Sequence, residues 1–135
     1  MIQLITGNKG TGKTKQLIEM VNQSLDTTKG DVVCIEKGDK LRFEVKPQCR
    51  LINTKEYAID DAEDLYGFVA GILASNNDVT DLYIDSALKI CKDDIDEFDK
   101  ILDKVADLAA KKEVNCVMTL SMPAENATDT IKKYL

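Results

Sequence analysis

A short glycine-rich segment near the start of the chain carries the clearest chemical pattern in the sequence. Residues 7–14, GNKGTGKT, match G-x-x-x-x-G-K-[ST] in full. Glycine lets the backbone curl so that several N–H groups point inward, and a concave ring of N–H groups binds phosphate oxygens. A helix that begins directly after Gly12 would add the positive end of its dipole. The segment therefore predicts a loop that binds phosphate groups.

Two side chains of this loop have expected parts in holding a nucleoside triphosphate. Lys13 would contact the β- and γ-phosphates, and the Thr14 hydroxyl would bind Mg²⁺. The remaining candidate residues contribute N–H groups or flank the phosphates: Gly7, Asn8, Lys9, Gly10, Thr11, Gly12 and Lys15. No N-K-x-D segment that would recognise guanine is present. We therefore expect ATP with Mg²⁺ as the ligand.

The alternative to a binding site is a glycine-rich turn that holds no ligand. Glycine makes up about 7% of residues in an average protein, so chance produces this pattern in roughly one chain of this length in a few hundred. The segment also follows a strand-like run and precedes a helix-like one, as phosphate binding requires. Both points favour a nucleotide site.

Two acidic residues follow apolar runs further along the chain. Asp85 ends one run, where a carboxylate could hold Mg²⁺ through its water shell. Glu36 ends another and is the best candidate for a base that orients the attacking water. Each has a plainer interpretation, Asp85 as a cap and Glu36 as an exposed acid that opens the next turn. The candidate catalytic residues are Lys13 and Glu36, and the candidate metal ligands are Thr14 and Asp85.

The elements that must position these residues can be read from the apolar pattern. Continuous apolar runs predict buried strands, and apolar residues at helical spacing predict the helices that cover them. The expected strands are 2–6, 31–36, 81–85 and 114–120, and the expected helices are 13–25, 60–75, 94–112 and a short 125–134. This alternation predicts a single α/β domain over residues 1–135, in three α/β/α layers around a mostly parallel sheet of about five strands.

The segment from residue 37 to residue 57 gives the weakest pattern. Leu41, Phe43 and Val45 alternate with polar residues, which is typical of a strand, and a second short apolar run follows Pro47. We expect a hairpin or an edge strand here, and the sequence does not choose between them.

Several of these features together resemble the RecA-like P-loop ATPases. They are the loop at residues 7–14, the strand that ends in Glu36, and Ile-Asp-Ser-Ala at residues 84–87. In that family another strand lies in the sequence between the Walker A loop and the Walker B aspartate. In RecA itself, the end of that strand can supply the glutamate that polarises the attacking water.

The resemblance implies a role for individual residues of this chain. Asp85 would be the Walker B aspartate, and Glu36 would be the glutamate that polarises water. Ser121, at the end of the last interior strand, would be the polar sensor of the γ-phosphate, in preference to Thr119. Related ATPases carry a glutamate directly after the Walker B aspartate, but position 86 is serine here.

The function that this resemblance implies is a Mg²⁺-dependent ATPase, a nucleoside-triphosphate hydrolase whose nucleotide state signals to a protein partner. The only arginines are Arg42 and Arg50, both in the uncertain segment. An arginine finger would therefore come from a partner or from a second copy of the chain. The pilus-retraction ATPases of the PilT type share this core, but they carry histidine-bearing segments and this chain has no histidine.

Two other functions stay open. The layout is also similar to that of the thymidine kinases, which would make the chain a nucleoside kinase. That family has a glutamate after its Walker B aspartate and a cysteine-bearing zinc lasso, and neither is found here. The second alternative is a module that binds ATP without catalysis, in which the nucleotide stabilises the fold or controls assembly.

Composition narrows the classes of partner and compartment. The net charge of −6 argues against a surface that neutralises a nucleic-acid backbone. Four cysteines without a CxxC pair, and no histidine, argue against a zinc site, so we expect reduced core thiols. No apolar run approaches the roughly 20 residues that cross a bilayer, and no signal peptide is recognisable. We therefore expect a cytoplasmic protein without a membrane span.

An acidic cluster near the third helix-like segment is a weaker candidate for chemistry. Its members are Asp93, Asp94, Asp96, Glu97, Asp99 and Asp103. They lie along a predicted helix that has a clear apolar stripe, so we interpret them as the face of that helix exposed to solvent.

Overall fold

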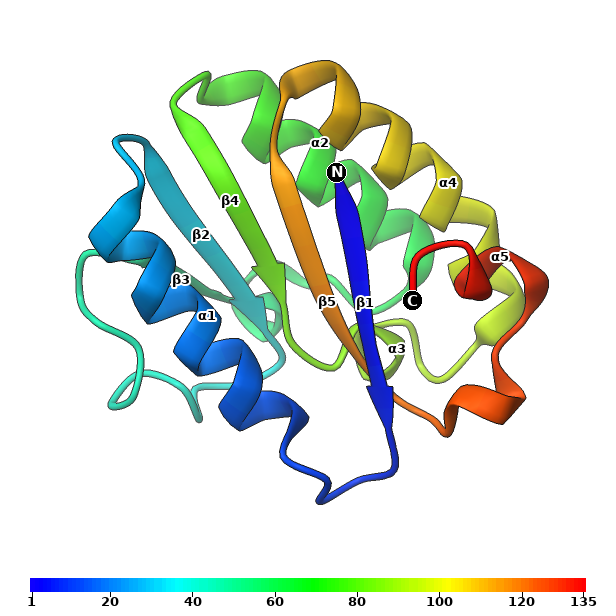
Figure 1. Cartoon of the computed structure of the whole chain (residues 1–135). Helices are drawn as coiled ribbons and strands as arrows, with labels where there is room; N and C mark the ends of the chain where they lie inside the picture. Colours follow the sequence, from blue (N-terminus) through cyan, green and yellow to red (C-terminus); the bar gives the residue numbers. More distant parts are fainter.

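The computed structural model describes residues 1–135 and contains five parallel strands with helices on both faces of the sheet (Figure 1). The strands are β1 (Ile2–Gly7), β2 (Asp31–Glu36), β3 (Arg50–Asn53), β4 (Val79–Ile84) and β5 (Asn115–Ser121). The helices are α1 (Lys13–Thr27), α2 (Ala62–Ser75), α3 (Ala87–Ile90), α4 (Ile95–Lys112) and α5 (Asp129–Lys132). Two 3₁₀ turns, η1 (Thr54–Tyr57) and η2 (Ala124–Asn126), complete the chain. The predicted α/β class with a parallel five-stranded sheet is confirmed.

The sheet has the spatial order β1-β5-β4-β2-β3. Because every pair of neighbours is parallel, all five carboxyl ends lie at one edge, the lower edge in Figure 1. The register brings Gly7 opposite Ser121 and Glu36 opposite Asn53 at that edge. Residues that end different strands therefore become neighbours in space.

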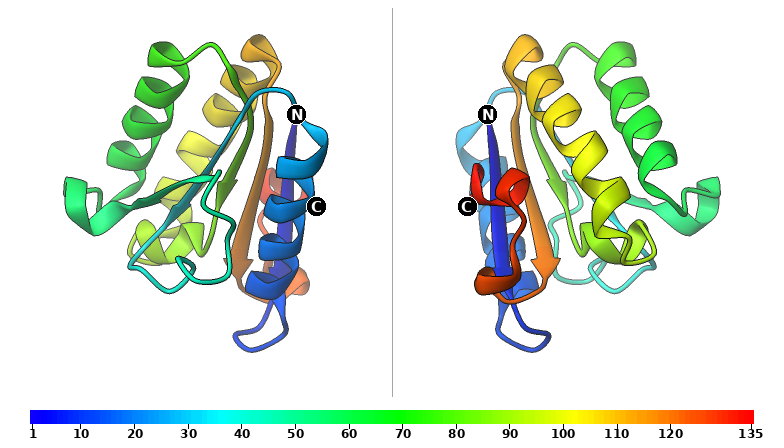
Figure 2. Two further views of the ribbon diagram at one scale, coloured as in Figure 1. Left: turned by 90° about the vertical axis from the view of Figure 1, so that its left-hand side faces the viewer. Right: turned by 90° about the vertical axis from the view of Figure 1, so that its right-hand side faces the viewer.

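The helices divide between the two faces according to the direction of each crossover. The connection through α1 runs from β1 across the sheet to β2, whereas α2 and α4 lead back toward β1. Right-handed crossovers that run in opposite directions place their helices on opposite faces. Figure 2 shows α1 on one side of the sheet and α2 and α4 on the other.

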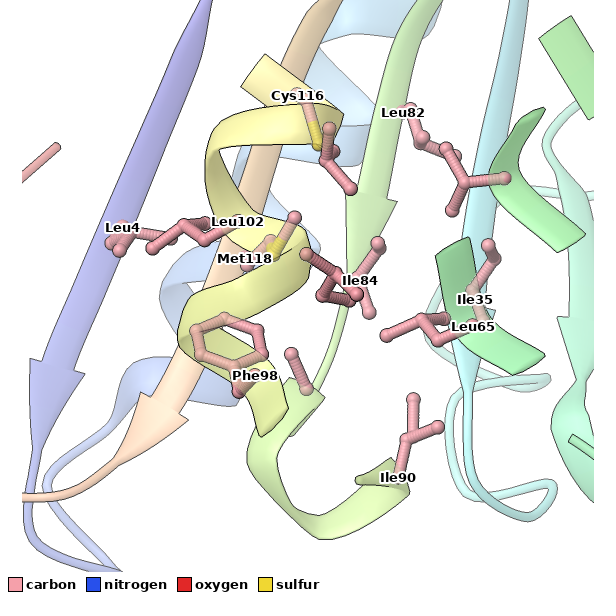
Figure 3. Close-up of a cluster of buried hydrophobic side chains, with 14 of the residues drawn as sticks. Leu4, Ile35, Leu65, Leu82, Ile84, Ile90, Phe98, Leu102, Cys116 and Met118 are labelled. Carbon is pink, nitrogen blue, oxygen red and sulfur yellow. The ribbon is translucent and has the colours of Figure 1, made fainter. Parts of the chain in front are cut away.

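Both faces of the sheet are covered by apolar side chains, which explains why its strands read as continuous apolar runs. On the side of α2 and α4, Ile84 and Met118 from the sheet pack in one cluster with Phe98 and Leu102 from α4 (Figure 3). On the other side, a smaller cluster packs α1 against the sheet, with Leu17 fully buried. No helix is long and apolar enough to span a membrane.

Of the two alternatives left open for the segment between β2 and β3, the edge strand is confirmed and the hairpin is wrong. Residues 50–53 do form an edge strand, but it runs parallel to β2. The segment before it contains a helical turn, in which the N–H groups of Glu44 and Val45 both donate to the Leu41 carbonyl at 3.0 Å. Leu41 and Val45 are buried, while Phe43 is 85% exposed. Leu41 and Val45 are four residues apart, a spacing that places two side chains on the same face of either a strand or a helical turn. The apolar pattern of this segment therefore came from a helical turn.

The C-terminal segment closes the outer edge of β1. The Leu4 N–H donates to the Tyr134 carbonyl at 2.8 Å, and the Gly7 N–H donates to the Met122 carbonyl at 2.8 Å. The predicted helix over 125–134 is wrong as a single element, because the chain forms η2 and α5 instead. Paired backbone groups replace an exposed strand edge at this position.

Candidate functional site

The glycine-rich loop joins β1 to α1 at the carboxyl edge of the sheet. Gly10 and Gly12 have φ values of 86° and 87°, in the left-handed region that favours glycine. The Lys13 ammonium donates to the Asn8 carbonyl at 3.0 Å, so this side chain folds back over the loop. No side chain caps the N-terminus of α1, which begins at Lys13. Its first N–H groups therefore remain available to a ligand.

Asp85 lies directly after β4 and is buried next to the start of α1. The Thr14 hydroxyl donates to both of its carboxylate oxygens, at 3.2 and 3.4 Å. The Thr119 hydroxyl, from β5, donates to Asp85 Oδ1 at 2.7 Å. The two predicted metal ligands, Thr14 and Asp85, are therefore in contact although 71 residues separate them in the chain.

Thr119 also belongs to the site, and its contact with Asp85 was not predicted from the sequence. Because β5 lies between β1 and β4, a β5 side chain can reach an acid at the end of β4. The Thr119 hydroxyl also accepts from the Ser86 N–H at 2.7 Å. The available sequence signal was that Thr119 and Ser121 are polar residues two apart at the end of a strand, which places them on one face.

Ser86 adopts an unusual backbone conformation at the turn from β4 to α3. Its φ and ψ are 54° and 52°, the left-handed region, which costs energy for a residue other than glycine. Such residues persist where the surrounding structure holds them in place, and they are frequent at functional sites. The hydrogen bond from its N–H to Thr119 is one such restraint.

A cavity of about 570 Å³ opens beside the loop. We call it the loop cavity. The predicted residues that line it are Lys9, Gly10, Gly12, Lys13, Thr14, Lys15, Asp85 and Ser121. Gly7, Asn8 and Thr11 belong to the same loop but do not line this cavity. The connections after β1 and β4 pass over opposite faces of the sheet, and crevices that bind ligands form outside the carboxyl ends of strands at such a switch.

The charge of the loop cavity is opposite to that of the whole chain. Five lysines line it, against two aspartates, although the net charge of the protein is −6. Two of these lysines, Lys40 and Lys89, come from the connections after β2 and β4. The cavity is therefore suited to an anion.

Glu36 does not line the loop cavity. Its side chain is only 3% exposed, so the interpretation of this residue as an exposed acid is wrong. One carboxylate oxygen accepts from the Lys40 N–H at 3.0 Å and the other from the Leu41 N–H at 3.2 Å. Burial raises the pKa of the Glu36 carboxyl, while these two hydrogen bonds act in the opposite direction. Glu36 therefore holds the connection that follows β2.

Glu36 and Asp85 instead share a smaller cavity of about 160 Å³. Ser86 also borders this space, and the remaining lining residues are lysines. The predicted base and the predicted metal ligand thus lie on the wall of one cavity, next to the loop cavity.

Neither arginine lines the loop cavity. Arg42 and Arg50 border a separate hollow of about 270 Å³ beside β3 and η1. Arg42 lies 3.7 Å from Asp39 in an exposed ion pair. No arginine of this chain is therefore in position to contact a ligand in the loop cavity.

Three of the acidic residues around α4 accept hydrogen bonds, one as the N-cap of α4 and two from the C-terminal segment. Asp94 caps α4 by accepting from the Glu97 N–H at 3.1 Å. Asp99 accepts from the Thr128 hydroxyl at 2.9 Å, and Asp103 accepts from Lys133 at 2.8 Å.

The four cysteines are free and buried, as predicted.

No protein-family model matches this chain, and a search of the curated proteins found no match.

Proposed function

We propose that this protein binds ATP with Mg²⁺ on the loop at residues 7–14. The observation that carries the proposal is the contact between Thr14 and Asp85, 3.2 Å apart beside a lysine-lined cavity. Mg²⁺ in nucleotide sites is bound through one or two protein oxygens together with phosphate oxygens and water. A hydroxyl and a carboxylate that meet beside a phosphate-binding loop form the protein part of such a set.

The remaining groups of the loop have complementary tasks in this proposal. The first N–H groups of α1 and the Lys13 ammonium would neutralise the phosphates. Lys13 would exchange its present hydrogen bond with the Asn8 carbonyl for phosphate oxygens. Ser121 borders the loop cavity and would meet the terminal phosphate.

We further propose a slow Mg²⁺-dependent ATPase of the RecA-like type that signals to a protein partner. The connections after β2 and β4 contribute Lys40 and Ser86 to the loop cavity, so both could respond to the terminal phosphate. Glu36 would orient the attacking water, since each carboxylate oxygen retains a second lone pair. An arginine from a partner or a second copy of the chain would complete the site.

A module that binds ATP without hydrolysis is the second candidate. It is favoured by the position of Glu36, whose two oxygens both accept backbone N–H groups and which lies outside the loop cavity. In that case, nucleotide binding would act by mass action on stability or assembly.

Isothermal titration with MgATP and MgGTP tests the binding proposal. We expect micromolar ATP affinity for the wild type and a loss of at least about tenfold, roughly 1.4 kcal/mol, in Lys13→Ala. Lys29→Ala is the matched control, because Lys29 is exposed and precedes β2 at the opposite edge of the sheet. If neither nucleotide binds the wild type, or Lys13→Ala binds equally well, the proposal is wrong.

Phosphate release by the wild type and by Glu36→Gln separates the two candidate functions. An ATPase should lose about a hundredfold or more in turnover in Glu36→Gln, as expected for a lost general base, while it still binds MgATP. Equal and slow release by the wild type and the variant would instead identify the non-catalytic module. Circular dichroism of the variant checks that its fold is retained.

A further inference from the structure

Lysines outnumber acids around the small cavity beside Glu36. Four lysines line it, and we call it the lysine cavity: Lys37, Lys40, Lys55 and Lys89. They come from three separate segments, namely the connection after β2, the turn η1 and the helix α3. Their convergence results from the order of the strands, since β2 lies between β3 and β4.

None of these four lysines forms an ion pair. The basic residues that do so lie elsewhere and each pairs with an acid: Arg42, Lys46, Lys92, Lys100 and Lys133. The side-chain nitrogens of the four lysines also form no hydrogen bond with the protein. Most other lysines of the chain are also unpaired, so the distinguishing feature of these four is that they converge on one small space in a chain with an excess of acidic residues.

The two acids that border the lysine cavity are engaged by other groups. Asp85 accepts from the hydroxyls of Thr14 and Thr119. Glu36 accepts from two backbone N–H groups. Four like charges around one small space repel one another, and neither acid forms an ion pair with them. An anion that entered the cavity would relieve this repulsion.

We propose that the lysine cavity binds the phosphate group of a small phosphorylated molecule, distinct from any nucleotide on the loop. Lysine ammonium groups bind phosphate as point charges, and the several lysines suit a doubly charged group. The volume of about 160 Å³ is well below the roughly 300 Å³ at which pockets for whole drug-sized ligands begin. The cavity therefore holds one phosphate group, while the rest of the molecule extends outward.

The lysine cavity adjoins the loop cavity without coinciding with it. Both are bordered by Lys40, Asp85, Ser86 and Lys89, whereas Lys37 and Lys55 border the lysine cavity alone. The proposed phosphate would thus lie across the Asp85–Ser86 wall from a ligand on the loop. This inference does not rest on nucleotide binding, because the four lysines converge whatever the loop binds.

Residue-resolved NMR with inorganic phosphate as the probe tests this proposal. Amide signals of Glu36, Lys37 and Lys55, which border the lysine cavity but not the loop cavity, report on the lysine cavity, and those of Gly10 and Gly12 report on the loop. At constant ionic strength set with chloride, phosphate should shift the lysine-cavity amides saturably. Lys37→Gln/Lys55→Gln should weaken that response about fivefold to tenfold and leave the loop amides unaffected. Lys29→Gln should change neither response.

Three outcomes would overturn the proposal. The first is that the lysine-cavity amides do not respond to phosphate, or respond equally to added chloride, which would indicate general screening. The second is that the double variant responds like the wild type. The third is that MgATP alone saturates these amides and phosphate then adds nothing, which would assign the cavity to the nucleotide's own terminal phosphate. Failure of MgATP to shift the loop amides would count against the nucleotide proposal only.

Discussion

Asp85 accepts hydrogen bonds from two hydroxyl groups that come from different elements. These hydrogen bonds need an oxygen at this position, whereas binding of a cation needs its negative charge. Thr119 donates to Oδ1 at 2.7 Å, and an asparagine side chain in place of Asp85 would still offer an oxygen to that hydroxyl. The negative charge would be lost, and with it the attraction for a divalent cation. Substitution at this residue can therefore test metal binding with little change in packing.

We expect Asp85→Asn to fold as the wild type does and to lose the effect of Mg²⁺ on ATP binding. Titrating ATP with Mg²⁺ or with EDTA should show at least about a tenfold gain from Mg²⁺, roughly 1.4 kcal/mol, in the wild type only. Asp93→Asn is the matched control, because Asp93 also borders the loop cavity and asparagine tolerates its left-handed backbone. An undiminished Mg²⁺ effect in Asp85→Asn would exclude Asp85 as a metal ligand.

Glu36 is an acid whose surroundings make the stability of the protein depend on pH. Burial raises the pKa of its carboxyl, although the Leu41 and Lys40 N–H groups oppose that shift. The native chain therefore binds this proton more tightly than the unfolded chain does. The contribution to stability is fully present below the unfolded pKa, about 4.3, and is lost as the pH rises through the raised folded value.

We expect the free energy of unfolding of the wild type, relative to Glu36→Gln, to fall as the pH rises from about 4 toward neutrality. A glutamine side chain does not titrate, so the variant lacks this contribution. Urea denaturation of both proteins across that range measures the difference. A difference that stays constant, or that grows with pH, would contradict the assigned direction of the Glu36 pKa shift.

At the scale of elements, the segment between β2 and β3 takes the place of a covering helix. Leu41, Val45 and Cys49 from this segment pack in the same cluster as Leu17 and Val21 of α1. Glu36 holds the start of the segment through the Lys40 and Leu41 N–H groups. The buried turn thereby positions Lys40 at the boundary between the two cavities.

Alanine substitutions at two neighbouring apolar residues should distinguish this turn from a strand lying flat on the surface. Leu41→Ala should cost about 2–5 kcal/mol in the free energy of unfolding, because Leu41 is 2% exposed. Phe43→Ala, at an 85% exposed position, should change it by less than about 0.5 kcal/mol. Urea denaturation measures both. Similar losses in the two variants would contradict the observed turn.

At the scale of the whole molecule, the four cysteines report on global unfolding. All are free and buried, and they lie in both apolar clusters of the sheet. Burial raises the pKa of the Cys116 thiol to about 12 and that of Cys49 to about 11. The reactive form of a thiol is the thiolate, so the folded protein holds these groups inert.

We expect a thiol reagent such as DTNB to label none of the cysteines quickly in the native protein at pH 8. All four should react in denaturing urea, so the labelling rate in native buffer should follow the population of unfolded chains. Saturating MgATP should slow labelling further if the loop binds it, since a ligand of the native state stabilises that state. Rapid native labelling of any cysteine would show that its region opens locally.

Features that depend on neighbours along the chain could be predicted from the sequence. The loop at residues 7–14 and most of the strands and helices follow from glycine spacing and from periods of 2 and 3.6, which are local properties. Asp85 and Glu36 were identified for the same reason, as acids that end apolar runs. The predicted bounds of the main strands and helices agree with the structure within two residues.

Which of these residues meet was settled by the tertiary fold. The order β1-β5-β4-β2-β3 brings Thr119 to Asp85 and four lysines to one cavity, and no local period encodes that order. It also decided between two interpretations of Leu41 and Val45, whose spacing fits both a strand and a helical turn until burial selects one. Contacts between distant residues depend on how whole layers pack, so the chemistry between strands emerged only in the folded chain.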